Sequence, residues 1–183
     1  VNAEGEHWII TKEAHHNLKH QIKDLDIIQE IDPNDLIGGF VENPFTGDKL
    51  PIFPASFVSG SYGSGVVFSE PADAPADYIA LQDLKNNKEL IAKYHLEDII
   101  DDVNPINVCS VKGYGEIPAA EIIEKLGIKD QNDPKLHDAT NELYKIEHRK
   151  GIISEHIPEY GGKKVSVARE EFKADMIAKN MAT

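Results

Sequence analysis

The chain has 183 residues, of which 40% are apolar and 7% aromatic, a composition that suits one folded domain. Its 32 acidic residues outnumber 19 lysines and arginines, and the net charge of −13 argues against an autonomous nucleic-acid binder. A single cysteine excludes an intrachain disulfide and a zinc site built from cysteines. We find neither an apolar run of the ~18–20 residues that span a membrane nor a signal peptide, and therefore expect a cytoplasmic protein without a membrane partner.

The first half of the sequence predicts short strands and one helix. Thr11 is placed to cap a helix over residues 12–21, and Asp32-Pro33-Asn34 predicts a turn. Gly38 beside Gly39 indicates a bulge or a close approach of the backbone. Segments with the apolar, β-branched composition of strands are residues 7–11, 27–31, 36–41, 49–53 and 66–69, with a hairpin turn over 43–48.

From residue 77 onward the pattern is helical, apart from one further predicted strand over residues 104–111. Pro118 marks the start of a helix that runs to Leu126, and Asp133-Pro134 opens a long helix that ends at Gly151. A last helix begins at Ser166 or Val167 and runs to about Met181.

These elements predict an α+β fold, with a small β-barrel-like curved sheet core flanked by helices and a helix-rich insertion in the C-terminal half. We expect one domain over residues 1–183. Its β-rich core with the first helices covers residues 1–103 and 104–115, and the helix-rich extension covers residues 116–183.

The acidic excess lies in residues 1–103, because residues 104–183 carry 13 acids and 12 bases. This last part holds the basic residues best suited to contact a phosphate: Lys145, Arg149, Lys150, Lys163 and Lys164. The alternative is a salt-bridged helix surface, with Glu142 and Glu147 as their partners.

Three other features favour structural roles. The glycine-rich residues 60–65 do not fit a phosphate-binding loop, because a strand is predicted to follow and no Gly-Lys-Ser/Thr is present. Of the histidines His15, His16 and His20, the last two could share a metal, but no third ligand is evident, so we expect exposed histidines and no metal site. Cys109 lies in an apolar predicted strand, which favours a buried thiol over a nucleophile.

An acidic stretch follows the glycine-rich segment and holds Glu70, Asp73 and Asp77. Asp77 is placed to cap the helix that follows, with Pro75 just before it. A carboxylate at this point could also bind an ammonium group in a pocket. Spacing alone leaves both interpretations open.

The order of these residues resembles a known family. The run from Tyr62-Gly63-Ser64-Gly65-Val66 to Pro71 and Asp77-Tyr78 is similar to the Gly-Thr-Gly-x-Val…Pro…Asp-Asp-Tyr signature of the editing domain of class I aminoacyl-tRNA synthetases. The segments that narrow the resemblance to the archaeal and eukaryotic leucyl enzyme are residues 7–14, 80–85, 92–94, 111–115 and 131–136.

The resemblance implies hydrolytic proofreading of tRNA(Leu) mischarged with isoleucine, valine or norvaline, since a methylene gives a synthetic site only about 1–3 kcal/mol of discrimination. It implies that Asp77 binds the substrate α-ammonium and that Phe68 forms a wall of the pocket. A bound water would be the nucleophile, without a metal, and fixed donors would stabilise the oxyanion. Residues implied to border the pocket are Tyr62, Gly63, Ser64, Gly65 and Asp73.

The same resemblance implies no cofactor for editing, since ATP with Mg serves only the synthetic core, which this chain lacks. The implied partners are the 3′ end of tRNA(Leu) and the rest of the parent synthetase. The family's Gly-Thr-Gly is Gly-Ser-Gly here, which keeps the hydroxyl. The family's threonine-rich strand has no counterpart, because Thr11, Thr46 and Thr140 are the only threonines before Thr183.

The sequence also has no HIGH-like or KMSKS-like motif. We therefore expect an excised piece of a larger enzyme that is weak or inactive alone. Two alternatives are a non-catalytic tRNA- or protein-docking module, favoured by the basic residues, and a metal-dependent hydrolase that uses His16 and His20.

Overall fold

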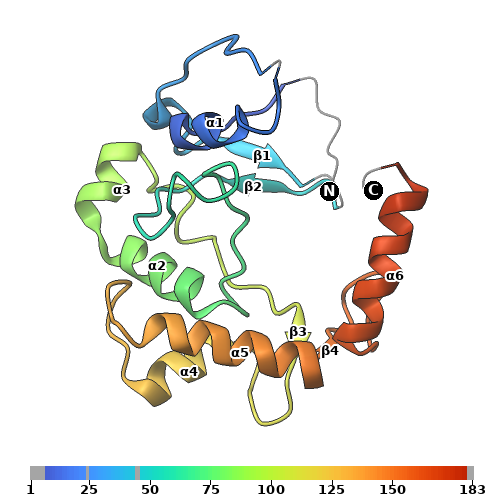
Figure 1. Ribbon diagram of the computed structural model, residues 1–183. Helices are drawn as coiled ribbons and strands as arrows, with labels where there is room; N and C mark the ends of the chain where they lie inside the picture. The colour runs from blue at the N-terminus through green and yellow to red at the C-terminus, as the bar shows by residue number, and fades with distance from the viewer. Residues whose placement is uncertain (1–6, 24, 44–45, 181–183) are drawn as a thin grey trace. The chain divides into compact units, whose positions relative to one another are not determined.

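The computed structural model describes residues 7–23, 25–43 and 46–180 (Figure 1). The chain divides into two compact units: unit 1 comprises residues 1–8, 69–79 and 105–183, and unit 2 comprises residues 9–68 and 80–104. The predicted mixture of helices and strands is confirmed, and the described strands form two two-stranded sheets. No helix within the described ranges has the length and apolar character needed to cross a membrane.

Unit 1 is mainly helical. It contains α4 (Pro118–Leu126), α5 (Leu136–Lys150) and α6 (Val165–Ala178), together with the short antiparallel pair β3 (Cys109–Ser110) and β4 (Ile152–Ile153). Helices α4 and α5 pack side by side, as Figure 1 shows. The buried side chains of this core are Ile79, Ala119, Ile122, Ile123, Ile128, Leu136, Ala139 and Leu143.

The ends of α4 and the C-terminal end of α5 lie where the sequence predicts them, whereas α5 begins at Leu136 rather than at Asp133-Pro134. Pro118 is the first residue of α4, where its missing N–H costs nothing and its fixed φ suits the helix. Gly127 ends α4 in the left-handed conformation (φ 62°), and the Ile128 N–H donates to the Ile123 carbonyl at 3.0 Å. Gly151 follows the last residue of α5 as predicted.

Unit 2 contains α1 (Lys12–Leu18), the 3-10 turn η1 (Pro33–Asp35), α3 (Lys88–Tyr94) and the hairpin of β1 (Phe40–Glu42) with β2 (Lys49–Pro51). Helix α2 (Pro75–Asn86) passes from unit 1 into unit 2 after Ile79. The buried core of unit 2 is formed by Leu81, Leu84, Leu96 and Ile100.

The local signals of unit 2 are confirmed. The Thr11 hydroxyl caps α1 by accepting from the Ala14 N–H at 3.1 Å, although the helix ends at Leu18 rather than near residue 21. Asp32 caps the predicted turn. Strands β1 and β2 pair in antiparallel register, with Val41 opposite Leu50. The tip of their predicted connection, residues 44–45, lies outside the described residues.

Three predicted strands are wrong: residues 7–11, 27–31 and 66–69 are not assigned to strands in the described chain. Ile28 is 72% exposed, and Val66 is also exposed. A strand needs a hydrogen-bonded partner, which composition alone does not supply. The last helix begins at Val165, slightly before the predicted start, and Met181 lies outside the described residues.

Gly38 is one position where glycine is required, because its φ is +85° and a Cβ atom would lie 3.1 Å from the Tyr94 carbonyl oxygen. Gly47 has a similar φ of +76°, but a Cβ atom there would have nothing within 4 Å. We expect Gly38→Ala to lower the free energy of unfolding by more than Gly47→Ala, which should cost about 1 kcal/mol for the left-handed conformation alone. Urea unfolding of both variants measures the difference. If both variants lose the same free energy of unfolding, the backbone at Tyr94 moves away from the new Cβ atom without cost.

Candidate functional site

The acidic stretch of unit 1 forms a tight loop that ends in α2. The Asp73 and Ala74 N–H groups both donate to the Glu70 carbonyl oxygen, at 3.1 and 2.8 Å. Asp77 is not the helix cap that the sequence predicts, because α2 begins at Pro75 and places Asp77 in its first turn. Its carboxylate instead accepts from the Glu70 N–H at 2.7 Å and from the Ser69 side chain. The side chain therefore closes the loop onto the helix.

Asp73 fastens this loop to strand β3. Its side chain is only 4% exposed, and Oδ2 accepts from the Val108 N–H at 3.1 Å, with a further backbone bond from Cys109. The other oxygen, Oδ1, is buried without a hydrogen-bond partner. Burial raises the pKa of Asp73 to about 6, while the backbone donors oppose the rise.

Glu147 on α5 is a second buried carboxyl in this unit. It is 8% exposed, and its Oε1 also has no hydrogen-bond partner. Burial, followed by the negative charges of Asp73 and Glu70, raises its pKa to about 8. The predicted role of Glu147 as a surface salt-bridge partner is therefore wrong. It follows Ala139 and Leu143 at steps of four, so the apolar periodicity of α5 already placed it on the buried face.

The two remaining carboxyls of the cluster show shifts of the same sign. Partial desolvation and the charge of Asp77 raise the pKa of Glu70, and desolvation raises the pKa of Asp77 against its two hydrogen bonds. The pKa of Tyr144 on α5 rises to about 12, through partial burial and then the charges of these acids. We define Glu70, Asp73, Asp77 and Glu147 as the carboxyl cluster. Its excess of negative charge suits a cationic group.

Cys109 lies on β3 beside this cluster. The thiol is buried as predicted, and burial together with the charges of Glu147 and Asp73 raises its pKa to about 12. A thiol with this pKa is protonated at neutral pH, which makes it a poor nucleophile.

The predicted glycine-rich part of the site belongs to unit 2, whereas Asp73 and Asp77 belong to unit 1. Gly63 and Gly65 have positive φ values of 58° and 77°, and the Thr11 N–H donates to the Ser64 carbonyl at 2.9 Å. A Cβ atom on Gly65 would collide with the Thr11 side chain. The loop is thus packed against the N-terminus of α1.

The side chains on and after this loop differ in their contacts and exposure. The Ser64 hydroxyl donates to the Val66 carbonyl at 2.8 Å and lies 3.2 Å from the Val66 N–H, so it stabilises the turn. Tyr62 and Phe68 are 77% and 64% exposed. Two aromatic surfaces within unit 2 are therefore open to contact.

The histidines of α1 make local contacts. A His15 ring nitrogen lies 3.2 Å from the Leu25 carbonyl, and the rings of His16 and His20 meet edge to face at 5.4 Å. Across the described parts of the chain, no group of three or more His, Cys, Asp or Glu residues is arranged to hold a metal ion.

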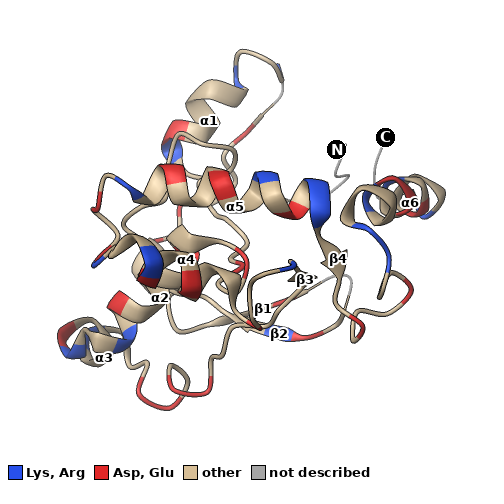
Figure 2. Cartoon of the chain, turned by 90° about the horizontal axis from the view of Figure 1, so that it is seen from below, with Lys and Arg blue, Asp and Glu red and all other residues tan. Residues whose placement is uncertain are grey.

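The predicted phosphate-contacting residues lie at the C-terminal end of α5 and before α6 (Figure 2). Lys145, Arg149, Lys150 and Lys164 are exposed. Lys163 instead pairs with Glu171 of α6 at 2.5 Å. The exposed members are thus available to an anionic partner.

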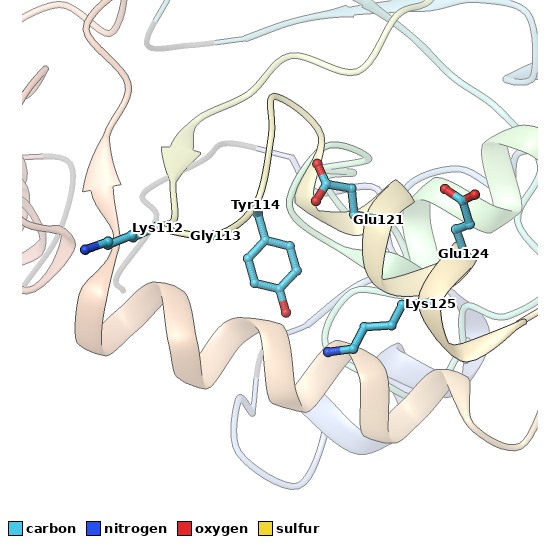
Figure 3. A pocket seen from close by; sticks show the side chains of 6 residues that line it. All are labelled: Lys112, Gly113, Tyr114, Glu121, Glu124 and Lys125. Atoms are coloured by element: carbon cyan, nitrogen blue, oxygen red, sulfur yellow. The ribbon is translucent and has the colours of Figure 1, made fainter.

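A separate open pocket of about 590 Å³ lies between the turn after β3 and α4 (Figure 3). Its side chains carry both signs of charge: Lys112, Tyr114, Glu121, Glu124 and Lys125, with Gly113 between the first two. The Gly115 N–H donates to Glu121 Oε1 at 2.5 Å, so one of the two carboxylates is already engaged. The pocket contains none of the predicted site residues.

Comparison with curated proteins gives close relatives along nearly the whole chain. The leucine–tRNA ligase of Methanothermobacter thermautotrophicus is 58% identical over 170 residues, which is 93% of this chain and 18% of that protein. The enzyme of Pyrococcus abyssi is 43% identical over 179 residues, 97% of this chain and again 18% of the relative. The chain therefore spans less than a fifth of these relatives. No family model matches the sequence.

Solved structures share the fold. The editing domain of the P. falciparum cytosolic leucyl-tRNA synthetase matches with a TM-score of 0.82 at 23% identity, over 95% of this chain and 60% of that one. The crystal structure of GlLeuRS-CP1 matches with a TM-score of 0.78 at 23% identity, over 94% of this chain and 66% of that one. Sequence and fold therefore agree in a similarity to part of the aminoacyl-tRNA synthetases.

Within that class the chain is similar along nearly its whole length to a segment of archaeal leucine–tRNA ligases, and it shares the fold of solved leucyl-tRNA synthetase editing domains. The resemblance drawn from the sequence is thus confirmed.

The carboxyl cluster predicts how stability depends on pH. All four pKa values are raised in the folded chain, so the folded state binds more protons than the unfolded state between pH ~4 and ~8. Stability should be greatest near the unfolded pKa values and fall as pH rises through the folded ones. Thermal unfolding of the chain from pH 5 to pH 9 measures this, and a melting temperature that rises over the range would contradict the cluster's electrostatics.

Proposed function

We propose that this chain is the proofreading segment of a leucyl-tRNA synthetase and takes part in hydrolysing tRNA(Leu) mischarged with isoleucine, valine or norvaline. The observation that carries the proposal is the half-buried Asp77 carboxylate, which Glu70 and Ser69 hold in place within a group of acids. An α-ammonium group has the charge and size that this position favours. Homology to archaeal leucine–tRNA ligases supports the same assignment.

In the proposed reaction Asp77 binds the α-ammonium of the wrong amino acid and so fixes its carbonyl carbon. A water molecule attacks that carbon, the ester C–O bond breaks, and the ribose hydroxyl of the terminal adenosine leaves with a proton. The products are the free amino acid and uncharged tRNA. Editing in this scheme uses no cofactor, while ATP with Mg serves the synthetic core of the parent enzyme.

We assign recognition of the substrate's amino-acid side chain to residues of unit 2. Phe68 and Tyr62 offer exposed aromatic surface for an aliphatic side chain and for the adenosine end. Gly63 and Gly65 permit a turn that residues with a Cβ atom enter only at a cost, and the Ser64 hydroxyl holds it. These residues, and Asp73 in unit 1, are proposed to take part in substrate binding.

We propose further that the curved, barrel-like sheet is completed by other parts of the parent polypeptide. Apolar side chains are exposed in the extended segments and on β1, among them Ile27, Ile28, Phe40 and Val66. The solved editing domains are longer, since the chain covers 60–66% of them. Residues 1–183 would then be one incomplete editing domain that works in the cytoplasm with the rest of the synthetase and the 3′ end of tRNA(Leu).

The first test concerns Asp77 in the parent synthetase. We expect Asp77→Ala to slow deacylation of isoleucyl-tRNA(Leu) by about 10–100-fold, because an ionic hydrogen bond to the substrate is worth about 1.5–3 kcal/mol. Asp138→Ala is the matched control, since Asp138 is an exposed aspartate in the first turn of α5. Equal deacylation rates in the Asp77→Ala variant and the parent enzyme would remove the site assignment. The isolated chain should be far slower than the parent.

A second candidate function, a non-catalytic tRNA-docking module, is favoured by the exposed basic end of α5. Under this alternative, replacing Arg149 and Lys150 by Gln should weaken tRNA binding and lower its salt dependence by about two phosphate contacts. Filter binding of tRNA to the chain at several salt concentrations measures both effects. Salt-dependent binding that needs these residues, with deacylation unaffected by Asp77→Ala, would favour docking over editing.

A further inference from the structure

The carboxyl cluster contains two buried acids that the proposed mechanism does not use. Asp73 and Glu147 are each more than nine-tenths buried, and each has one oxygen without a hydrogen-bond partner. Two ionised carboxylates in a low-dielectric interior repel each other strongly, and an isolated buried charge is costly even alone. A proton on one of them removes the repulsion and the cost of burying that group's charge.

The contacts decide which acid ionises first. Asp73 accepts backbone N–H groups from Val108 and Cys109, and such donors favour the ionised form. Glu147 has no comparable backbone donors among its described contacts, and the acids that face it are Asp73 and Glu70. The remaining titratable groups coupled to it are Cys109 of β3 and Tyr144 of its own helix, both neutral at pH 7. On α6, Arg169 contacts His148 rather than Glu147.

A chain of contacts connects this pair to Asp77. Asp73 holds the loop onto β3, its own N–H donates to the Glu70 carbonyl, and the Glu70 N–H donates to the Asp77 carboxylate. The Ala119 N–H fixes the same loop from α4 by donating to the Ala72 carbonyl at 3.0 Å. A displacement of Asp73 would therefore pass to Asp77 through Glu70.

We propose that Glu147 is a positioning residue for Asp77 that acts through Asp73, by carrying a proton in the folded protein so that Asp73 alone is ionised. This inference rests on the proposed function. When Glu147 loses its proton, its charge repels Asp73, the loop loses its fixed position, and Asp77 binds the substrate ammonium less well. The Asp77-dependent deacylation rate should therefore fall as Glu147 ionises.

The decisive experiment compares Glu147→Gln with Glu142→Gln, which makes the same change at an exposed position of the same helix. Gln keeps the shape of the protonated acid and cannot ionise. In the parent synthetase the ratio of the unsubstituted to the Glu147→Gln deacylation rate should be near one at pH 6.5. It should fall towards about one tenth at pH 9, since a group with a pKa of about 8 is then roughly 10% protonated.

The Glu142→Gln variant should follow the unsubstituted enzyme at every pH. A ratio for Glu147→Gln that is constant from pH 6.5 to pH 9, in an enzyme whose deacylation depends on Asp77, would overturn the positioning role. Adding Glu147→Gln to Asp77→Ala should cause no further change with pH, because the effect passes through Asp77.

Thermal unfolding of the 183-residue chain tests the proton itself, independently of editing. The fall in melting temperature between pH 6 and pH 9 should shrink in Glu147→Gln and persist in Glu142→Gln. Asp73→Asn should move the remaining fall to lower pH, because the charge of Asp73 raises the pKa of Glu147. A Glu147→Gln chain that keeps the full pH dependence would overturn the inference. If Asp77→Ala leaves deacylation unchanged while these shifts occur, the proposed function and the positioning role both fail, and only the protonation of Glu147 is supported.

Discussion

The interaction on which unit 1 depends is the buried carboxylate of Asp73, which accepts hydrogen bonds from the backbone N–H groups of Val108 and Cys109 where strand β3 begins. It joins a loop near residue 70 to a strand near residue 108, which no helix or sheet ladder connects directly. Side-chain-to-backbone bonds of this kind are worth more when the acceptor is charged. The loop in turn fixes Glu70 and the start of α2, so the placement of Asp77 follows from a residue four positions earlier.

This anchor has an electrostatic cost that shapes its surroundings. Ionised Asp73 sits in an interior where Glu147 also lies, and neither has a paired cation among its described contacts. The net charge of −13 is therefore more than a property of the surface, because part of it is concentrated beside Asp77. Negative potential at this point attracts an ammonium group and disfavours a phosphate. The exposed basic residues lie instead around the end of α5 and the start of α6, where a phosphate backbone is the better partner.

The sequence predicted what local chemistry determines. Pro118 and Gly151 mark helix ends because their backbone preferences act on their own turn, and Thr11 and Asp32 cap through side chains a few residues away. The Asp77 cap failed because Pro75 already supplied a start for α2. The burial of Glu147 was not predicted, because its charge was taken to place it on the surface although its spacing from Ala139 and Leu143 places it on the buried face of α5. The electrostatic coupling of Asp73 and Glu147, which lie more than seventy residues apart in the chain, leaves no local signal in the sequence.

The wrong strand predictions have a different cause. Residues 27–31 and 66–69 have strand composition, yet a strand's free energy comes from the partner that satisfies its N–H and C=O groups and covers its side chains. Each unit closes a core from its own residues, but the core of unit 2 is formed mainly by residues 81–100, on and after helices α2 and α3, and leaves Ile28 and Phe68 exposed. Helices satisfy their backbone internally and so survive separation from neighbouring sequence, and sheets do not. The failed strand predictions therefore fall in unit 2, where composition indicates strands and the described residues supply no partner for them.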